Sequence, residues 1–246
     1  IIASVCAKGQ TILKNCAIEP EIQDLIIFLK KLGCNIKFSQ KRKIIINETK
    51  SFLPVTHNIM FDRIELGTYL IASALAGKKL SFYNINPKII KTELKILKKM
   101  GVKLKIGNNF ITVYKSHKIK RANIKTDPYP GFPTDLQAQI MVLMTQAKGQ
   151  SKIIESIFEN RFMHVPELKR MGAKIKIKEN MAKVYGPSKL SGAEVMATDL
   201  RASVCLVLAG LIAEKETTIN RIYHLDRGYE KLEKKLKQCK AIIKRA

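Results

Sequence analysis

Three aspartates open three apolar segments that have the composition of buried helices. Asp62, Asp135 and Asp199 each precede such a segment, and Thr134 and Thr198 stand before two of them. The simplest interpretation of any one aspartate is a helix N-cap, because its carboxylate accepts hydrogen bonds from the free N–H groups of the first turn. If the three helices point the same way, their N-termini converge on one face, and that face attracts anions. Capping and anion binding are compatible here.

Arginine is scarce in this chain, with 9 arginines among 45 basic residues. An arginine in a lysine-rich background is more often placed where a planar, bidentate donor is needed. Arg161, Arg201 and Arg227 follow strands or helix starts, in the strings ENR, DLR and DRG. Surface salt bridging is the alternative, and we adopt it for Arg170 and Arg245. The other three together predict a site for a phosphate or a carboxylate.

No nucleophile or nucleotide motif accompanies these residues. The sequence has no G-x-S-x-G string, no P-loop and no dinucleotide fingerprint. Its five cysteines are widely spaced without a C-x-x-C pair, and its four histidines are isolated. We therefore expect a reducing compartment, no metal site and no cofactor. His164 is expected to pack at the start of a helix and not to act as a base.

The formal net charge of +25 invites a nucleic-acid interpretation. The lysines are spread along the whole chain, however, and no aromatic stripe of the kind used by single-strand binders accompanies them. Solvated lysine faces are the favoured interpretation, and a basic nucleic-acid-binding module is kept as an alternative. No apolar run reaches the ~18 residues that a membrane span needs. The longest, residues 204–213, predicts a buried helix.

One pattern recurs four times: an apolar helix, a lysine-containing turn, a strand, an amphipathic helix, a stop and further strands. The turns are expected at residues 8–9, 77–78, 148–149 and 214–215, and the strands that follow at 10–13, 80–83, 151–154 and 217–220. Gly33, Gly101 and Gly172 are expected to end the amphipathic helices in a left-handed conformation, with Cys239 at the fourth equivalent place. Strands such as 102–106 and 173–177 alternate lysine with apolar residues.

A period of about 70 residues is too long for a solenoid and fits βαβ-type units repeated within a globular domain. The first helix of each unit is apolar nearly all round and should be buried. The fold class predicted is therefore α/β, with helices inside and sheets outside. The stretch Ser51–Met60 predicts a link, which gives one unit in residues 1–59 and three in 60–246. Residues 1–7 look like the interior of a helix, and the fourth unit has one closing strand where the others have two. Both ends of the chain are therefore expected to lack packing partners.

Four strings resemble those of the enolpyruvyl transferase family, in the branch that acts on UDP-N-acetylglucosamine. They are GFPTDLQAQ at 131–139, FENRFMHVPEL at 158–168, LSGAEVMATDLRAS at 190–203 and RIYHLDRGYE at 221–230. The resemblance runs from Ile1 to the C-terminus. The shikimate-pathway relative shares the repeat but not these strings. The resemblance implies an inside-out α/β barrel of two domains with three repeats each, of which residues 1–59 would be the last unit of an incomplete first domain.

The resemblance also implies a reaction. The family transfers the enolpyruvyl group of phosphoenolpyruvate to the 3-hydroxyl of UDP-N-acetylglucosamine, the first committed step of peptidoglycan synthesis, in the cytoplasm. By resemblance, Asp135 is the base at the reacting hydroxyl, and Ile157, often Val in the family, holds the nucleotide sugar through its backbone. Arg201 and Arg227 serve phosphoenolpyruvate and the closed cleft, with Asp199 and Arg161 in the same charged wall.

The family's proton donor is a cysteine, or in some members an aspartate, on a Gly-rich loop of the first domain. No cysteine here has that context, so we expect the donor to come from an N-terminal part of the same enzyme. The chain alone is expected to be inactive. A non-catalytic remnant is the alternative within the same family.

Overall fold

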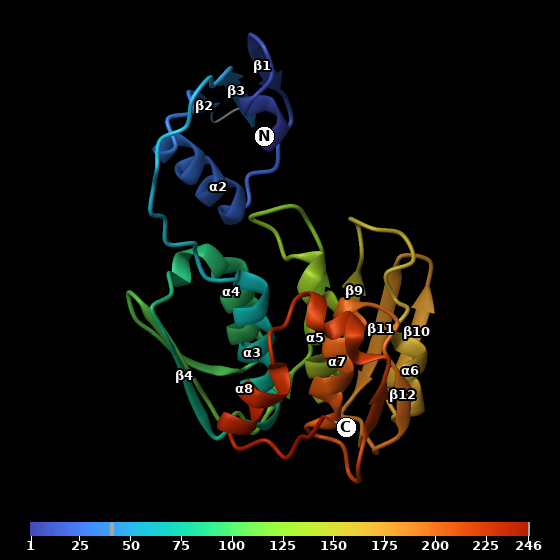
Figure 1. Ribbon diagram of the computed structural model, residues 1–246. Coiled ribbons are helices and arrows are strands. Elements are labelled where there is room, and N and C mark those ends of the chain that lie inside the picture. The colour runs from blue at the N-terminus through green and yellow to red at the C-terminus, as the bar shows by residue number, and fades with distance from the viewer. Residues whose placement is uncertain (40–41, 246) are drawn as a thin grey trace. The chain divides into compact units, whose positions relative to one another are not determined.

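The computed structural model describes residues 1–39 and 42–245, apart from the side chain of Ala202. The chain forms two compact units (Figure 1). The first contains residues 1–61 and 128–130, and the second contains residues 62–127 and 131–246. The division along the chain falls two residues after the predicted boundary at 59/60.

The smaller unit is a three-stranded antiparallel sheet packed on one main helix. Strands β1 (Gln10–Leu13), β2 (Ile36–Ser39) and β3 (Lys43–Asn47) pair in the order β1-β3-β2. A short helix, α1 (Ile2–Val5), precedes them, and α2 (Pro20–Lys31) begins with a proline, whose fixed φ suits a first turn. The core of this unit is aliphatic: Val5, Ile26, Leu29, Cys34, Ile36, Ile44 and Ile46.

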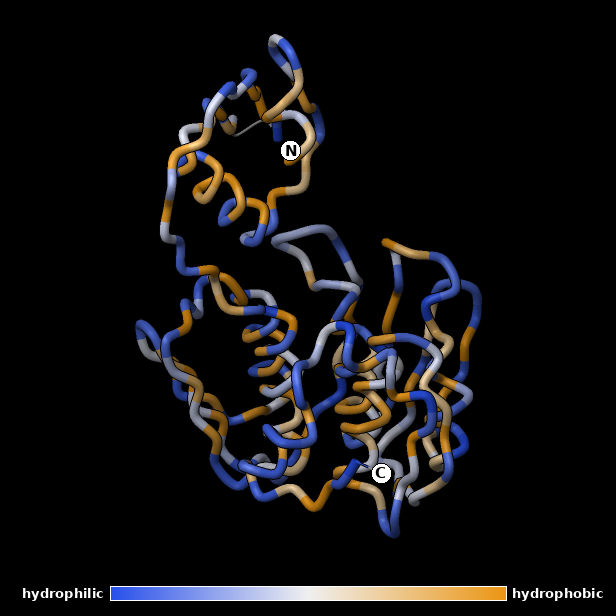
Figure 2. Tube along the Cα trace, viewed as in Figure 1, coloured by the Kyte–Doolittle hydropathy of each residue, from blue (hydrophilic) through white to orange (hydrophobic). Residues whose placement is uncertain are grey.

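Three helices form the interior of the larger unit: α3 (Arg63–Ala76), α5 (Gln137–Thr145) and α7 (Leu200–Gly210). They pack side by side, with α5 in contact with both α3 and α7 (Figure 1). Every residue of α5 is buried, as expected for a helix without a polar face. Figure 2 shows mostly hydrophobic colours along these helices.

The outer layer of the larger unit begins with β4 (Lys79–Tyr83), β5 (Lys103–Ile106) and β6 (Phe110–Tyr114), in the order β4-β6-β5. Both β4 and β5 run antiparallel to β6 and are therefore parallel to each other. The turn η1 (Pro87–Ile90) and the helix α4 (Lys91–Lys99) connect them. This repeat is thus a βαβ crossover with a further strand inserted between its two strands.

The next sheet repeats this plan with β9 (Ala147–Ile154), α6 (Val165–Arg170), β10 (Lys174–Lys178) and β11 (Met181–Gly186), in the order β10-β11-β9. Two short strands, β7 (Ile119–Lys120) and β8 (Asn123–Lys125), pair parallel to β9. The turn η2 (Thr134–Leu136) leads from β8 into α5.

The last unit contains the parallel pair β12 (Glu194–Met196) and β13 (Thr218–Asn220), the turn η3 (Ile222–Arg227) and the helix α8 (Leu232–Gln238). Lysines on β5 and β10 are exposed, namely Lys103, Lys105, Lys174 and Lys176. The predicted inside-out α/β arrangement, with buried helices and outer sheets, is confirmed.

Gly33, Gly101 and Gly172 have positive φ angles, so the predicted left-handed helix stops are confirmed. Two other predictions were wrong. The sequence pattern places Cys239 at the fourth stop as a departure from the glycine pattern, but it has a φ of −81°, and the left-handed residue is Lys240. Helix α8 ends at Gln238, so its C′ position falls one residue after Cys239. The turn expected at residues 148–149 lies within β9, where Gly149 takes up a positive φ and the strand continues.

Candidate functional site

Asp135 stands in η2 at the entry to α5, and it does not cap that helix. No side-chain cap is formed at this helix start. One carboxylate oxygen, Oδ1, instead contacts two arginines: Arg161 Nη2 lies 3.1 Å away, and the Nη2 atom of Arg201 also contacts it. Within the described residues no hydrogen bond or ion pair involves Oδ2. The carboxylate is about one-third exposed, so Oδ2 is open to a ligand.

Arg161 is held from two sides. Its guanidinium lies over the ring of Phe158, 5.0 Å from the ring centre, and bonds to Asp135. Burial lowers the pKa of Arg161, and the neighbouring Arg201 lowers it further, while Asp135, Asp199 and Glu155 act in the opposite direction. The lowered pKa therefore comes mainly from burial, within a crowded cluster of two arginines and three carboxylates.

Asp199 and Asp62 behave as the N-caps that the sequence predicted. Asp199 Oδ1 accepts a hydrogen bond from Arg201 N at 2.7 Å. Asp62 Oδ1 accepts from Ile64 N at 2.7 Å and from Glu65 N at 3.0 Å. The cap expected from Thr134 and Asp135 was wrong, because Thr134 donates to Glu155 and Asp135 binds arginines.

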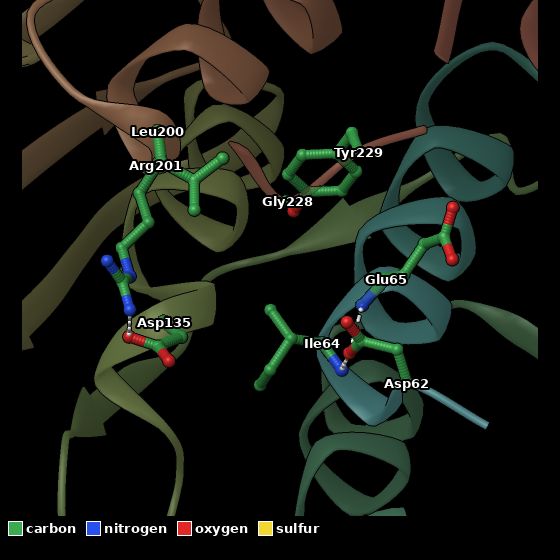
Figure 3. A pocket seen from close by; sticks show the side chains of 8 residues that line it. All are labelled: Asp62, Ile64, Glu65, Asp135, Leu200, Arg201, Gly228 and Tyr229. Carbon is green, nitrogen blue, oxygen red and sulfur yellow. Dashed lines mark hydrogen bonds and ion pairs between the residues drawn. The ribbon is translucent and has the colours of Figure 1, made fainter. Parts of the chain in front are cut away.

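The three helix starts open on one cavity of about 140 Å³ (Figure 3). Its lining residues are Asp62, Ile64, Glu65, Asp135, Leu200, Arg201, Gly228 and Tyr229. Figure 3 shows the Arg201 guanidinium directed at Asp135, whereas the Asp62 carboxylate is directed back at its own helix. The predicted convergence of the helix N-termini is therefore confirmed.

Arg227 ends η3 and is exposed. It does not line the cavity, but its neighbours Gly228 and Tyr229 do. A Cβ on Gly228 would lie 2.9 Å from a methyl carbon of Leu200, the first residue of α7. A larger residue at position 228 would displace the Leu200 side chain, so the glycine allows the segment that carries Arg227 to lie close to the start of α7.

Residues 1–236 match the family model for EPSP synthase (3-phosphoshikimate 1-carboxyvinyltransferase). The chain belongs to this family. It is 58% identical over 245 residues to the UDP-N-acetylglucosamine 1-carboxyvinyltransferase of Pelagibacter ubique and 50% identical to that of Rickettsia bellii. All of this chain is matched in both comparisons, and it spans 59% and 58% of the two relatives.

Solved structures agree with this family membership. The enolpyruvyl transferase NikO from Streptomyces tendae superimposes with a TM-score of 0.90 at 28% identity, covering 98% of this chain and 58% of NikO. EPSP synthase from Acinetobacter baumannii gives a TM-score of 0.73 at 17% identity over 97% of this chain and 58% of that one, which supports the fold alone.

Ile157 lies in the loop after β9 and is half-buried. Its backbone N–H donates to Glu155 Oε1 at 2.9 Å. In this member of the EPSP synthase family, the backbone group of Ile157 that remains for a ligand is the carbonyl oxygen.

His164 is only 2% exposed. Burial lowers its pKa from 6.5 to about 4, Asp199 raises it and Arg161 lowers it. The histidine precedes the first residue of α6, so its predicted packing role at a helix start is confirmed. Among the described residues no group of three histidine, cysteine, aspartate or glutamate side chains could hold a metal ion. None of the helices in the described part of the chain has both the length and the apolar character of a membrane span.

Two buried polar groups at the site had no signal in the sequence. Glu155 follows β9 and is 2% exposed. A triangle of Thr68, Gln139 and Tyr229 joins α3, α5 and the segment after η3, with the Tyr229 hydroxyl 2.8 Å from Thr68 Oγ1 and 3.4 Å from Gln139 Nε2. Gln139 Nε2 also donates to the Asp135 carbonyl at 2.9 Å. No sequence motif identifies either group, because the hydrogen-bonding partners are distant in sequence and only the fold brings them together.

Proposed function

We propose that this chain supplies the charged wall of an enzyme that transfers the enolpyruvyl group of phosphoenolpyruvate to the 3-hydroxyl of UDP-N-acetylglucosamine. The observation that carries the proposal is the Asp135 carboxylate, with one oxygen bound to two arginines and the other open. The names of the relatives at 58% and 50% identity support it. The chain spans only about three-fifths of their length, so the activity of the whole protein is part of the proposal.

The chemistry assigns different tasks to the charged residues. The sugar hydroxyl adds to C2 of phosphoenolpyruvate while C3 gains a proton, and phosphate then leaves C2 while C3 loses a proton, which restores the double bond. Asp135 Oδ2 is the base for the hydroxyl, since a base must lie within hydrogen-bond reach of the proton it removes. Oδ1, held by Arg161 and Arg201, fixes the direction of Oδ2.

Phosphoenolpyruvate carries a phosphate and a carboxylate, which suit planar bidentate donors. Arg201 and Arg227 are the donors that we assign to it, with Arg161 and Asp199 completing the wall. The carbonyl of Ile157 accepts from the nucleotide sugar. We assign the catalytic roles to Asp135 and Arg227.

The proton donor for C3 is proposed to come from a further segment of the enzyme, N-terminal to this one and carrying a cysteine or an aspartate. The chain alone is then expected to release no phosphate. The proposed setting is peptidoglycan synthesis in the cytoplasm, with a role in cell shape and division, and with no cofactor, metal, nucleic acid or membrane required.

The test is phosphate release from phosphoenolpyruvate by the full-length protein, with and without UDP-N-acetylglucosamine. Release that depends on the nucleotide sugar, with formation of its enolpyruvyl ether, supports the proposal. Release with shikimate 3-phosphate instead would assign the chain to the other branch, and no release with either acceptor would overturn the proposed activity.

A further inference from the structure

Glu155 is a buried carboxylate that accepts four hydrogen bonds. The donors are Thr126 Oγ1 at 2.8 Å, Thr134 Oγ1 at 3.0 Å, Ile157 N at 2.9 Å and Phe158 N at 3.3 Å. A charge that is 2% exposed is tolerated only with such complete compensation. The carboxylate is absent from the cavity lining, so it has no direct route to a ligand there.

The two oxygens of Glu155 face different parts of the fold. Oε1 accepts from Thr126, which follows β8, and from the two N–H groups of the loop after β9. Oε2 accepts from Thr134 alone. One planar group therefore connects the loop after β9 to the turn that precedes α5.

Three of these four donors carry or adjoin a proposed functional group. Thr134 is the neighbour of Asp135 in η2. Ile157 carries the backbone carbonyl assigned to the nucleotide sugar. Phe158 supports the guanidinium of Arg161 at 5.0 Å, and Arg161 in turn bonds to Asp135.

A second link reinforces the same junction. Ser156 N donates to Thr126 Oγ1 at 2.9 Å, and Thr126 N donates to Ile154 O at 2.9 Å. Thr126 is fully buried. The loop after β9 is thus fixed to the end of β8, and the Thr134 side chain joins η2 to this frame.

We infer that Glu155 is a positioning residue that sets Asp135 relative to Ile157 and Arg161 through its bond to Thr134. The inference rests on the proposed function, because its consequence is the alignment of the base with the sugar hydroxyl. A displacement of about 1 Å at a reacting group can cost on the order of 100-fold in rate. Loss of the Thr134 bond removes the side-chain link between η2 and Glu155, while the Gln139 bond to the Asp135 carbonyl and the arginine contacts remain.

The test uses Thr134, since removal of Glu155 itself leaves several buried donors without acceptors and can prevent folding. Thr134→Val removes the hydroxyl with little change of shape, and Thr134→Ser keeps it. In the full-length protein, Thr134→Val is expected to lower kcat about 10-fold or more, with a smaller change in KM for either substrate. Thr134→Ser should restore kcat to within about threefold of the wild type, because its hydroxyl still reaches Glu155.

Thr112→Val is the matched control. Thr112 is 4% exposed, lies in β6 and shares one side-chain hydrogen bond with Ser81 at 2.9 Å. It should lose similar stability and keep its kinetics. Glu155→Gln is the second variant: the amide oxygen can serve the donors of Oε1, and the Thr134 hydroxyl can turn to accept from the amide, so kcat should fall less than in Thr134→Val.

The possible results distinguish failure of the proposed function from failure of the positioning role inferred for Glu155. A wild-type protein without turnover overturns the proposed function and this inference with it. An active wild type whose Thr134→Val variant matches Thr112→Val in kcat overturns the inference alone. A Thr134→Ser variant as slow as Thr134→Val would also overturn it, because the hydroxyl would then not be the cause.

Discussion

The starts of α3 and α5 hold the same residue type at the same place in two repeats and use it differently. Asp62 accepts two hydrogen bonds from its own helix at 2.7 and 3.0 Å. The Asp135 carboxylate accepts none from its helix and binds two arginines. A carboxylate used as a cap is occupied, whereas one turned away from the helix remains able to bind and to react. The difference lies in the surroundings, since only Asp135 has arginines opposite it.

The aspartate at the start of α7 combines the two roles, since it caps its own helix and also influences the neighbouring arginine. The Asp199 carboxylate caps its helix by accepting from Arg201 N at 2.7 Å. It also acts to raise the pKa values of Arg161 and His164. The same carboxylate thus fixes the backbone of Arg201 while the side chain of Arg201 reaches Asp135. The cap at α7 positions the group that holds the free carboxylate at α5.

The contrast between the capping Asp62 and the open Asp135 is tested most strongly by mutation of Asp135. Asp135→Asn removes the base but keeps the size of the side chain, so kcat of the full-length protein should fall about 100-fold or more. Binding of UDP-N-acetylglucosamine, measured by calorimetry, should weaken much less. Equal losses in kcat and affinity would contradict the role of base and leave Asp135 a binding residue.

The buried His164, at the start of α6, gives a test by pH. Its folded pKa of about 4 lies below the unfolded value of 6.5, so the unfolded chain binds the extra proton first as the pH falls. Stability should therefore be complete above pH 6.5 and fall by about 3 kcal/mol between pH 6.5 and pH 4. His164→Gln should flatten this part of the curve in urea unfolding, and a variant with the wild-type slope would contradict the assignment.

Contact with arginines distinguishes Asp135 from Asp62, and the contact of each arginine can be weakened individually by mutation. Arg161→Lys keeps the charge but loses the planar group that lies over Phe158 and bonds to Asp135, so kcat/KM should fall about 10-fold. Arg170→Lys is the control, because Arg170 makes an exposed ion pair with Glu167 at 3.6 Å and such pairs contribute little. Similar kcat/KM values for the two variants would argue against a specific role for Arg161.

The smallest effect is expected at the cap itself. Asp62→Ala leaves two N–H groups of α3 without their acceptor and should lower the free energy of unfolding by about 1 kcal/mol. Asp62→Asn should change it by only a few tenths of a kcal/mol, because asparagine caps equally well. Urea unfolding of both variants checks this, and an equal loss in Asp62→Asn and Asp62→Ala would show that the charge of Asp62 matters more than its capping.

Much of the fold followed from local patterns. The strand predicted at 10–13 coincides with β1, and the glycine stops have the expected backbone conformation. These features depend on apolar spacing and on positive φ angles, which short stretches of sequence encode. The left-handed Lys240 was missed because no glycine identifies its position.

The site was less predictable. The arginines and aspartates were identified by residue type and by resemblance, but which aspartate caps and which remains open depends on residues distant in sequence. Asp135 meets Arg201, 66 positions later, and Glu155 meets Thr126, 29 positions earlier. Such pairings depend on how the repeats pack, and no single unit carries the information.

The buried triangle of Thr68, Gln139 and Tyr229 has a consequence for folding specificity. Three related apolar helices could exchange places in a core with little loss of apolar contact. An exchanged arrangement would bury a hydroxyl, an amide or a phenol without a partner, at a cost of about 1–3 kcal/mol for each group. A few polar atoms at the centre thereby distinguish otherwise similar repeats and disfavour near-symmetric arrangements of the three helices.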